Sequence, residues 1–136
     1  MKVFLALQEA DARQELGDIP RARQALRDAE RARAAISRPD ELGGLFSCGL
    51  ARQCNYTMTV HLRAADVGKA VAAAELGLDA YRHGEERAYG TWAQIRICLA
   101  HAHLIARQLE AAQAALTPCS RRAGRTTPWP CRHPRP

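Results

Sequence analysis

Three residues that could bind a metal lie at helical spacing. Cys54, Met58 and His61 are spaced i, i+4 and i+7, so one helix face would present two sulfur ligands and an imidazole. Such a donor set suits copper or zinc. The same face continues with Leu62 and Ala65, which is typical of a face that packs against another helix. We therefore interpret it as part of a core and predict no metal there.

Two further groups of possible ligands are incomplete. Cys98 and His101 share a face at i and i+3, but a tetrahedral site needs ligands from another helix, and the spacing indicates none. Cys119, Cys131 and His133 lie in a proline-rich segment without periodicity. We predict that the chain binds no metal and no cofactor.

Motifs for covalent or phosphate chemistry are missing from the sequence. It contains no G-x-S-x-G nucleophile elbow, no glycine-rich phosphate loop and no H-E-x-x-H pair. The pair Gly43-Gly44 is more simply a flexible turn. We predict that the protein is not an enzyme.

Two polar stripes are the candidate binding residues. One lies on the helix expected at about 50–64 and the other on the helix expected at about 89–107. In stacked helical hairpins the first helix of each pair lines the concave side, so both stripes could face one groove. Arginines with a tyrosine would suit an acidic peptide or a terminal carboxylate, and an ordinary solvated face is the alternative. The predicted groove residues are Arg52, Tyr56, Thr59, Arg63, Arg96, His103 and Arg107.

The elements that carry these residues are all predicted to be helices. Alanine and leucine are abundant, whereas β-branched and aromatic residues are few. On the first helix we count Leu5, Ala12 and Leu16 among the apolar positions. The last helix is expected to end at Pro118. The expected ranges are 3–16, 19–36, 50–64, 67–81, 89–107 and 109–117.

One corner between helices recurs along the chain. In its first copy Gly17 ends a helix, Asp18 caps the next and Pro20 lies in the first turn. It aligns with corners at Asp66 and Gln108, at offsets of about 48 and about 42 residues, longer than the ~34 of a tetratricopeptide unit.

The aligned corners favour a tetratricopeptide-like array of about three antiparallel hairpins, the last one truncated. Small residues at Ala22, Ala70 and Ala112 would let the paired helices approach closely. A helical bundle without repeats is the alternative.

Two segments support a family resemblance. They are Pro39–Ser47 followed by Ala51-Arg52-Gln53, and Glu85–Gly90. With the corner, they resemble the tetratricopeptide-like C-terminal region of helix-turn-helix transcriptional regulators common in actinobacteria, from about Phe4 to Leu116. The resemblance implies a non-catalytic module that binds a protein or peptide, a second copy of itself included, as the sensing or oligomerising half of a regulator. We expect the family's N-terminal DNA-binding domain to be absent, because the chain opens inside a repeat.

The positive charge of the chain is concentrated at its end. The net charge is +6, but Arg121, Arg122, Arg125, Arg132 and Arg135 all follow Thr117, and no acidic residue does. We therefore divide the chain into a helical repeat domain at 1–117, which makes no direct nucleic acid contact, and a disordered Pro/Arg-rich tail at 118–136. The tail is a shifted reading frame of a GC-rich gene, a basic arm that binds nucleic acid, or a solvated extension.

The remaining expectations concern location and stability. The five cysteines include no C-x-x-C pair, the first apolar run stops at Gln8, and no stretch could cross a membrane, so we predict a cytoplasmic protein with reduced thiols. A truncated last repeat would leave Ile95, Leu99 and Ala106 poorly covered and make the protein marginally stable or self-associating. A truncated gene product without a function of its own remains an alternative.

Overall fold

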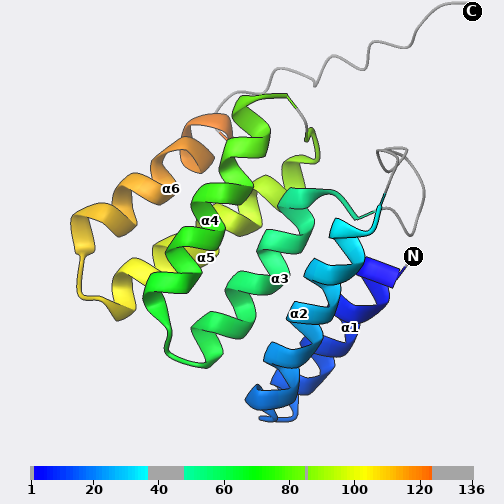
Figure 1. Ribbon diagram of the computed structural model, residues 1–136. Coiled ribbons are helices and arrows are strands. Elements are labelled where there is room, and N and C mark those ends of the chain that lie inside the picture. Colours follow the sequence, from blue (N-terminus) through cyan, green and yellow to red (C-terminus); the bar gives the residue numbers. More distant parts are fainter. Residues whose placement is uncertain (1, 37–47, 85, 124–136) are drawn as a thin grey trace, which may run out of the picture.

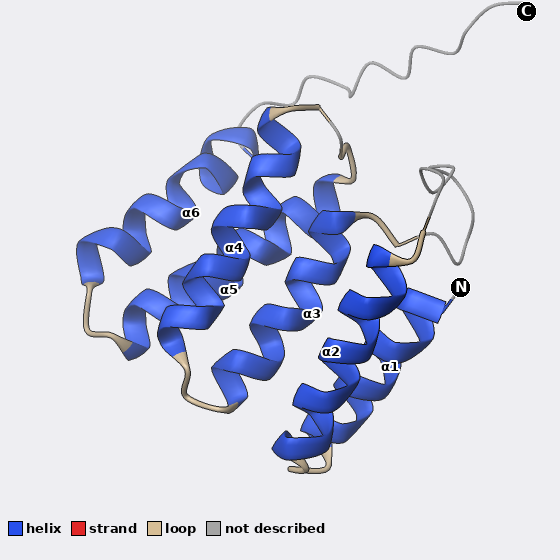
Figure 2. Cartoon of the chain, in the orientation of Figure 1, coloured by secondary structure: helices blue, strands red, loops and turns tan. Residues whose placement is uncertain are grey.

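Six helices form three hairpins in a row. The computed structural model describes residues 2–36, 48–84 and 86–123, all of them in helices or short links (Figures 1 and 2). α1 pairs with α2, α3 with α4 and α5 with α6, and neighbouring hairpins pack through α1–α3, α2–α3, α3–α5 and α4–α5. The predicted all-α array of three antiparallel hairpins is confirmed. The helices are α1 (Lys2–Glu15), α2 (Ile19–Ala34), α3 (Leu50–Arg63), α4 (Val67–Arg82), α5 (Tyr89–Ile105) and α6 (Leu109–Ala123).

The three hairpin corners share one backbone geometry. Each contains a residue in the left-handed region: Gly17 at φ 77°, Ala65 at φ 55° and Arg107 at φ 59°. In each corner this residue's N–H bonds to the carbonyl three positions earlier, and the next N–H bonds to the carbonyl five positions earlier. This is the Schellman arrangement, which closes the end of a helix. The side chains of Asp18 and Asp66 then cap α2 and α4.

Small residues are buried where the sequence predicts close helix packing. Ala22 and Ala70 have no exposed surface, and Ala112 is 3 % exposed. Gly77 is a further close approach, because a methyl group there would lie 2.9 Å from both Cys54 Cβ and Ile95 Cδ1. The contact joins α4 to α3 and α5, so this glycine lies where the second hairpin meets the third.

The buried face of α1 differs from the expected one. Leu5 is 57 % and Leu16 78 % exposed, and Ala12 is also exposed. The buried residues are instead Val3, Leu7, Ala10 and Gln14. The prediction was wrong because a glutamine occupies a buried position on this face and hides the apolar stripe.

Pro118 does not end the last helix, so that prediction was also wrong. α6 continues through Pro118 to Ala123. A proline removes the hydrogen bond to the carbonyl four positions earlier, here that of Ala114, which belongs to an exposed residue that water can reach. The nature of the tail beyond Ala123 stays a prediction, because residues 124–136 lie outside the described residues, as do 37–47 and Glu85.

The coverage of α5 also differs from the expectation. Ile95 is fully buried and Leu99 is packed against the cluster that α5 forms with α6, whereas Ala106 is exposed. The prediction was wrong for Ile95 and Leu99 because α4 and α6 cover them.

Among the described residues, no helix has the length and apolar character needed to cross a membrane. The large exposed apolar residues of the third hairpin are Ile97, Leu104, Ile105, Leu109 and Leu116.

Candidate functional site

A groove runs across the first helices of all three hairpins. Its volume is about 560 Å³, and we call it the inner groove. α1 contributes Asp11, α3 contributes four polar side chains, and the rest comes from the start of α5 and the link before it. Its lining residues are Asp11, Arg52, Asn55, Tyr56, Thr59, Glu86, Ala88, Gly90, Thr91 and Gln94.

Contacts with α1 hold the α3 side of the groove in place. The Arg52 guanidinium lies 4.7 Å from the centre of the Phe4 ring, a cation–π distance. The Tyr56 hydroxyl accepts a hydrogen bond of 2.6 Å from Gln8 Nε2. Three of the predicted residues, Arg52, Tyr56 and Thr59, therefore line one groove in fixed positions.

Two buried amide oxygens near the groove have no hydrogen-bond partner in the described part of the chain. One is Asn55 Oδ1, on a residue that is 8 % exposed, and the other is Gln14 Oε1, on a residue that is 4 % exposed. The Gln14 amide nitrogen is bonded, at 2.6 Å from Asp11 Oδ1 and 3.2 Å from Thr59 Oγ1. A buried acceptor without a partner costs about 1–3 kcal/mol. Turning the Asn55 amide toward the groove would let a ligand donor remove that cost.

The charge of the groove differs from the one expected. Arg52 is its only cation among the described lining residues, against the carboxylates of Asp11 and Glu86. Glu86 lies beside Gly49 at the N-terminus of α3, where a methyl group on the glycine would overlap the carboxylate. The groove is therefore a poor match for the acidic peptide that the arginine stripes suggested.

The other predicted residues lie elsewhere. Arg63 forms an ion pair with Glu15 at 2.7 Å. His103 Nδ1 lies 2.8 Å from Gln108 Oε1, and Arg107 is the left-handed residue of the third corner. None of these is among the described residues that line the inner groove. Their part in binding stays a prediction.

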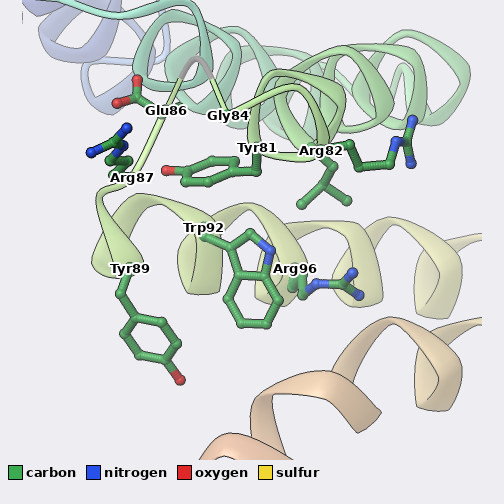
Figure 3. A pocket seen from close by; sticks show the side chains of 9 residues that line it. Tyr81, Arg82, Gly84, Glu86, Arg87, Tyr89, Trp92 and Arg96 are labelled. Carbon is green, nitrogen blue, oxygen red and sulfur yellow. The ribbon is translucent and has the colours of Figure 1, made fainter. Parts of the chain in front are cut away.

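Arg96 lines a second pocket, of about 430 Å³, between α4 and α5 (Figure 3). Its Nη1 donates to the Ala115 carbonyl at 3.1 Å, and its guanidinium lies 4.7 Å from the centre of the Trp92 ring. On the α4 side the Tyr81 hydroxyl donates to the Ala88 carbonyl at 2.7 Å, and burial raises the pKa of Tyr81 to about 12. The phenol thus stays protonated at neutral pH.

The two sulfur ligands considered for a metal lie in the core, whereas the His61 imidazole is only partly buried. Cys54 and Met58 are buried, and burial raises the pKa of the Cys54 thiol to about 11. Burial lowers the pKa of His61. Within the described ranges, no group of three His, Cys, Asp or Glu side chains could hold a metal ion.

The sequence reasoning missed Asn55 and Gln94. Asn55 shares a helix face with Arg52 and Thr59 at spacings of three and four residues, so this spacing could have identified it as a groove residue. Gln94 follows Arg52 by about 42 residues, the offset between the second and third corners.

Neither a scan against models of protein families nor searches of curated proteins and of solved structures gave a match to this chain.

Proposed function

We propose that this chain is a tetratricopeptide-like repeat module that binds a peptide or protein segment in the inner groove and catalyses no reaction. The observation that carries the proposal is the groove itself, which crosses the first helices of all three hairpins. Beside it lies the buried Asn55 amide oxygen, which has no hydrogen-bond partner among the described residues. The three matching corners support a repeat architecture, because each hairpin enters its second helix in the same way.

The groove chemistry suits the main chain of an extended peptide. Such a peptide has free N–H and C=O groups along its length. Once turned toward the groove, the Asn55 amide would offer an acceptor and a donor. Thr91 and Gln94 add polar side chains across the groove on α5. The carboxylates of Asp11 and Glu86 favour a neutral or basic peptide over an acidic one.

The resemblance to transcriptional regulators supports a proposed regulatory role for this binding. In that reading the module is the sensing half, it acts in the cytoplasm, and peptide binding is the signal. The described helices offer a binding surface for such a signal.

The test starts from a displayed library of random heptapeptides selected on the immobilised full chain. The affinity of an enriched peptide is then measured for Asn55→Leu, which removes the amide at similar volume. We expect a loss of about tenfold or more, because one hydrogen bond in a desolvated site is worth about 1–2 kcal/mol. Arg63→Ala is the matched control, since Arg63 lies on the same helix outside the groove.

Two results would overturn the proposal. One is a selection that enriches no peptide on the folded chain. The other is an enriched peptide whose affinity falls equally, or not at all, in both variants. Circular dichroism on each variant shows that the helices are intact.

A further inference from the structure

We propose that the second pocket binds a planar aromatic carboxylate. This pocket, which we call the aromatic pocket, lies between the C-terminal half of α4, the link that follows it and the start of α5 (Figure 3). Among the described residues, it shares only Glu86 with the lining of the inner groove. The inference therefore concerns a site separate from the proposed peptide groove.

Aromatic rings form one wall of this pocket and are held in fixed positions. The Tyr89 and Trp92 rings are stacked, with centroids 5.5 Å apart and planes inclined by 30°. Arg96 lies over the Trp92 ring and is anchored on the α6 backbone. Tyr81, across the pocket, is held by its hydrogen bond to Ala88. Preset aromatic walls favour a flat ligand, which gains contact area without ordering flexible side chains.

The charge of the pocket favours an anion. Its described lining residues include three arginines, of which Arg82 is paired with Asp79 at 2.6 Å. Arg96 donates to a backbone carbonyl, which leaves its charge unneutralised. Arg87 is exposed at the rim, and within the described residues no ion pair joins it to a carboxylate. Its fork of N–H donors matches a carboxylate in geometry.

Among the described lining residues, Glu86 is the one carboxylate, and its charge opposes an anion. Burial and then this charge raise the pKa of Tyr81, so the carboxylate acts on the pocket. The positive charges of Arg87 and Arg96 outnumber it. A ligand that packs its ring against Tyr81 and the edge of Trp92, whose faces Tyr89 and Arg96 cover, would bring its carboxylate toward Arg87.

Benzoate is the probe for this site, and the Trp92 indole N–H is the reporter. The chain has two tryptophans, so Trp129→Phe assigns the two indole signals in a proton–nitrogen spectrum of the full chain. We expect a saturable shift of the Trp92 signal with a Kd of about 1 mM, as befits so small a ligand. Benzamide lacks the charge and cyclohexanecarboxylate lacks the flat ring, and each should bind at least about fivefold more weakly.

Arg87→Gln keeps the length of the side chain and removes its charge. Because Arg87 is exposed, the variant should fold normally and bind benzoate at least about fivefold more weakly. Arg63→Ala and Asn55→Leu should leave benzoate binding unchanged, which separates this site from the inner groove. A shift that does not saturate, benzamide binding as tight as benzoate binding, or an unchanged affinity in Arg87→Gln would each overturn the proposal.

Discussion

Ala65 is the residue whose replacement best tests the shared corner geometry. It adopts φ 55° at the second corner, where the first corner has glycine at φ 77°. Its side chain is exposed, so removing the methyl group sacrifices no packing. We therefore expect Ala65→Gly to stabilise the protein, although most substitutions to glycine destabilise.

The size of the gain follows from two opposing terms. The left-handed conformation costs a residue with a Cβ about 1–2 kcal/mol, and glycine does not pay it. Glycine also makes the unfolded chain more flexible, which costs about 0.4–1 kcal/mol. The expected increase in the free energy of unfolding is the difference, about 0.5–1 kcal/mol, or about 2–4 °C in Tm.

Urea unfolding followed by circular dichroism measures this change. Ala64→Gly is the matched control, because Ala64 adopts φ −81° and its replacement by glycine should lower the free energy of unfolding by about 0.5–1 kcal/mol. Gly17→Ala should lose about as much as Ala65→Gly gains, since it is the reverse exchange at the equivalent position. If Ala65→Gly destabilised the protein as much as Ala64→Gly does, the left-handed corner would be wrong, and so would the match between corners.

Three further predictions concern the core, the last helix and pH. Ile95→Ala should lower the free energy of unfolding by about 2–5 kcal/mol in urea, because Ile95 is fully buried; a loss below about 1 kcal/mol would contradict this packing. Pro118→Ala should increase the helical circular dichroism signal and the stability, since it restores the missing bond of α6; an unchanged signal would mean that α6 ends before Pro118. Burial lowers the pKa of His61 from 6.5, so the folded protein binds this proton less tightly than the unfolded chain. The free energy of unfolding should therefore fall as the pH drops below about 6.5, until the pKa of the folded state is passed. The fall should be steeper than in His61→Gln, because that variant lacks the imidazole; equal slopes would refute the shift.

Helix positions could be predicted because their ends are encoded locally. The starts of α2, α3, α4, α5 and α6 agree with the expectation. At α2 and α4 an aspartate accepts a hydrogen bond from a backbone N–H of the first turn. Such signals act within a few residues and do not depend on the rest of the fold. The prediction that the last helix ends at Pro118 failed because it depends on the surroundings. The cost of a proline inside a helix depends on whether water can reach the carbonyl that the proline leaves without a partner.

The groove was predicted only in part because its residues on α5 were chosen by their charge and not by their position in the repeat. The second and third corners are about 42 residues apart, which places Gln94 at the position of Arg52. Arg96 lies two residues further, roughly 200° around the helix, and so faces Trp92 and α6 instead. Two arginines on successive first helices therefore looked equivalent while pointing to different pockets. Transferring the corner offset, rather than the charge, identifies the α5 side of the groove.

The exposure of an equivalent position depends on what packs next to it. Leu26, Ala74 and Leu116 occupy the same place in the three second helices, yet they are 5 %, 0 % and 41 % exposed. α2 packs on α3 of the following hairpin and α4 on α5, whereas α6 contacts only α5 within the described residues. Repeat alignment therefore predicts which way a side chain points, because that is set by the helix and its corner. It does not predict burial, which each hairpin obtains from its neighbour.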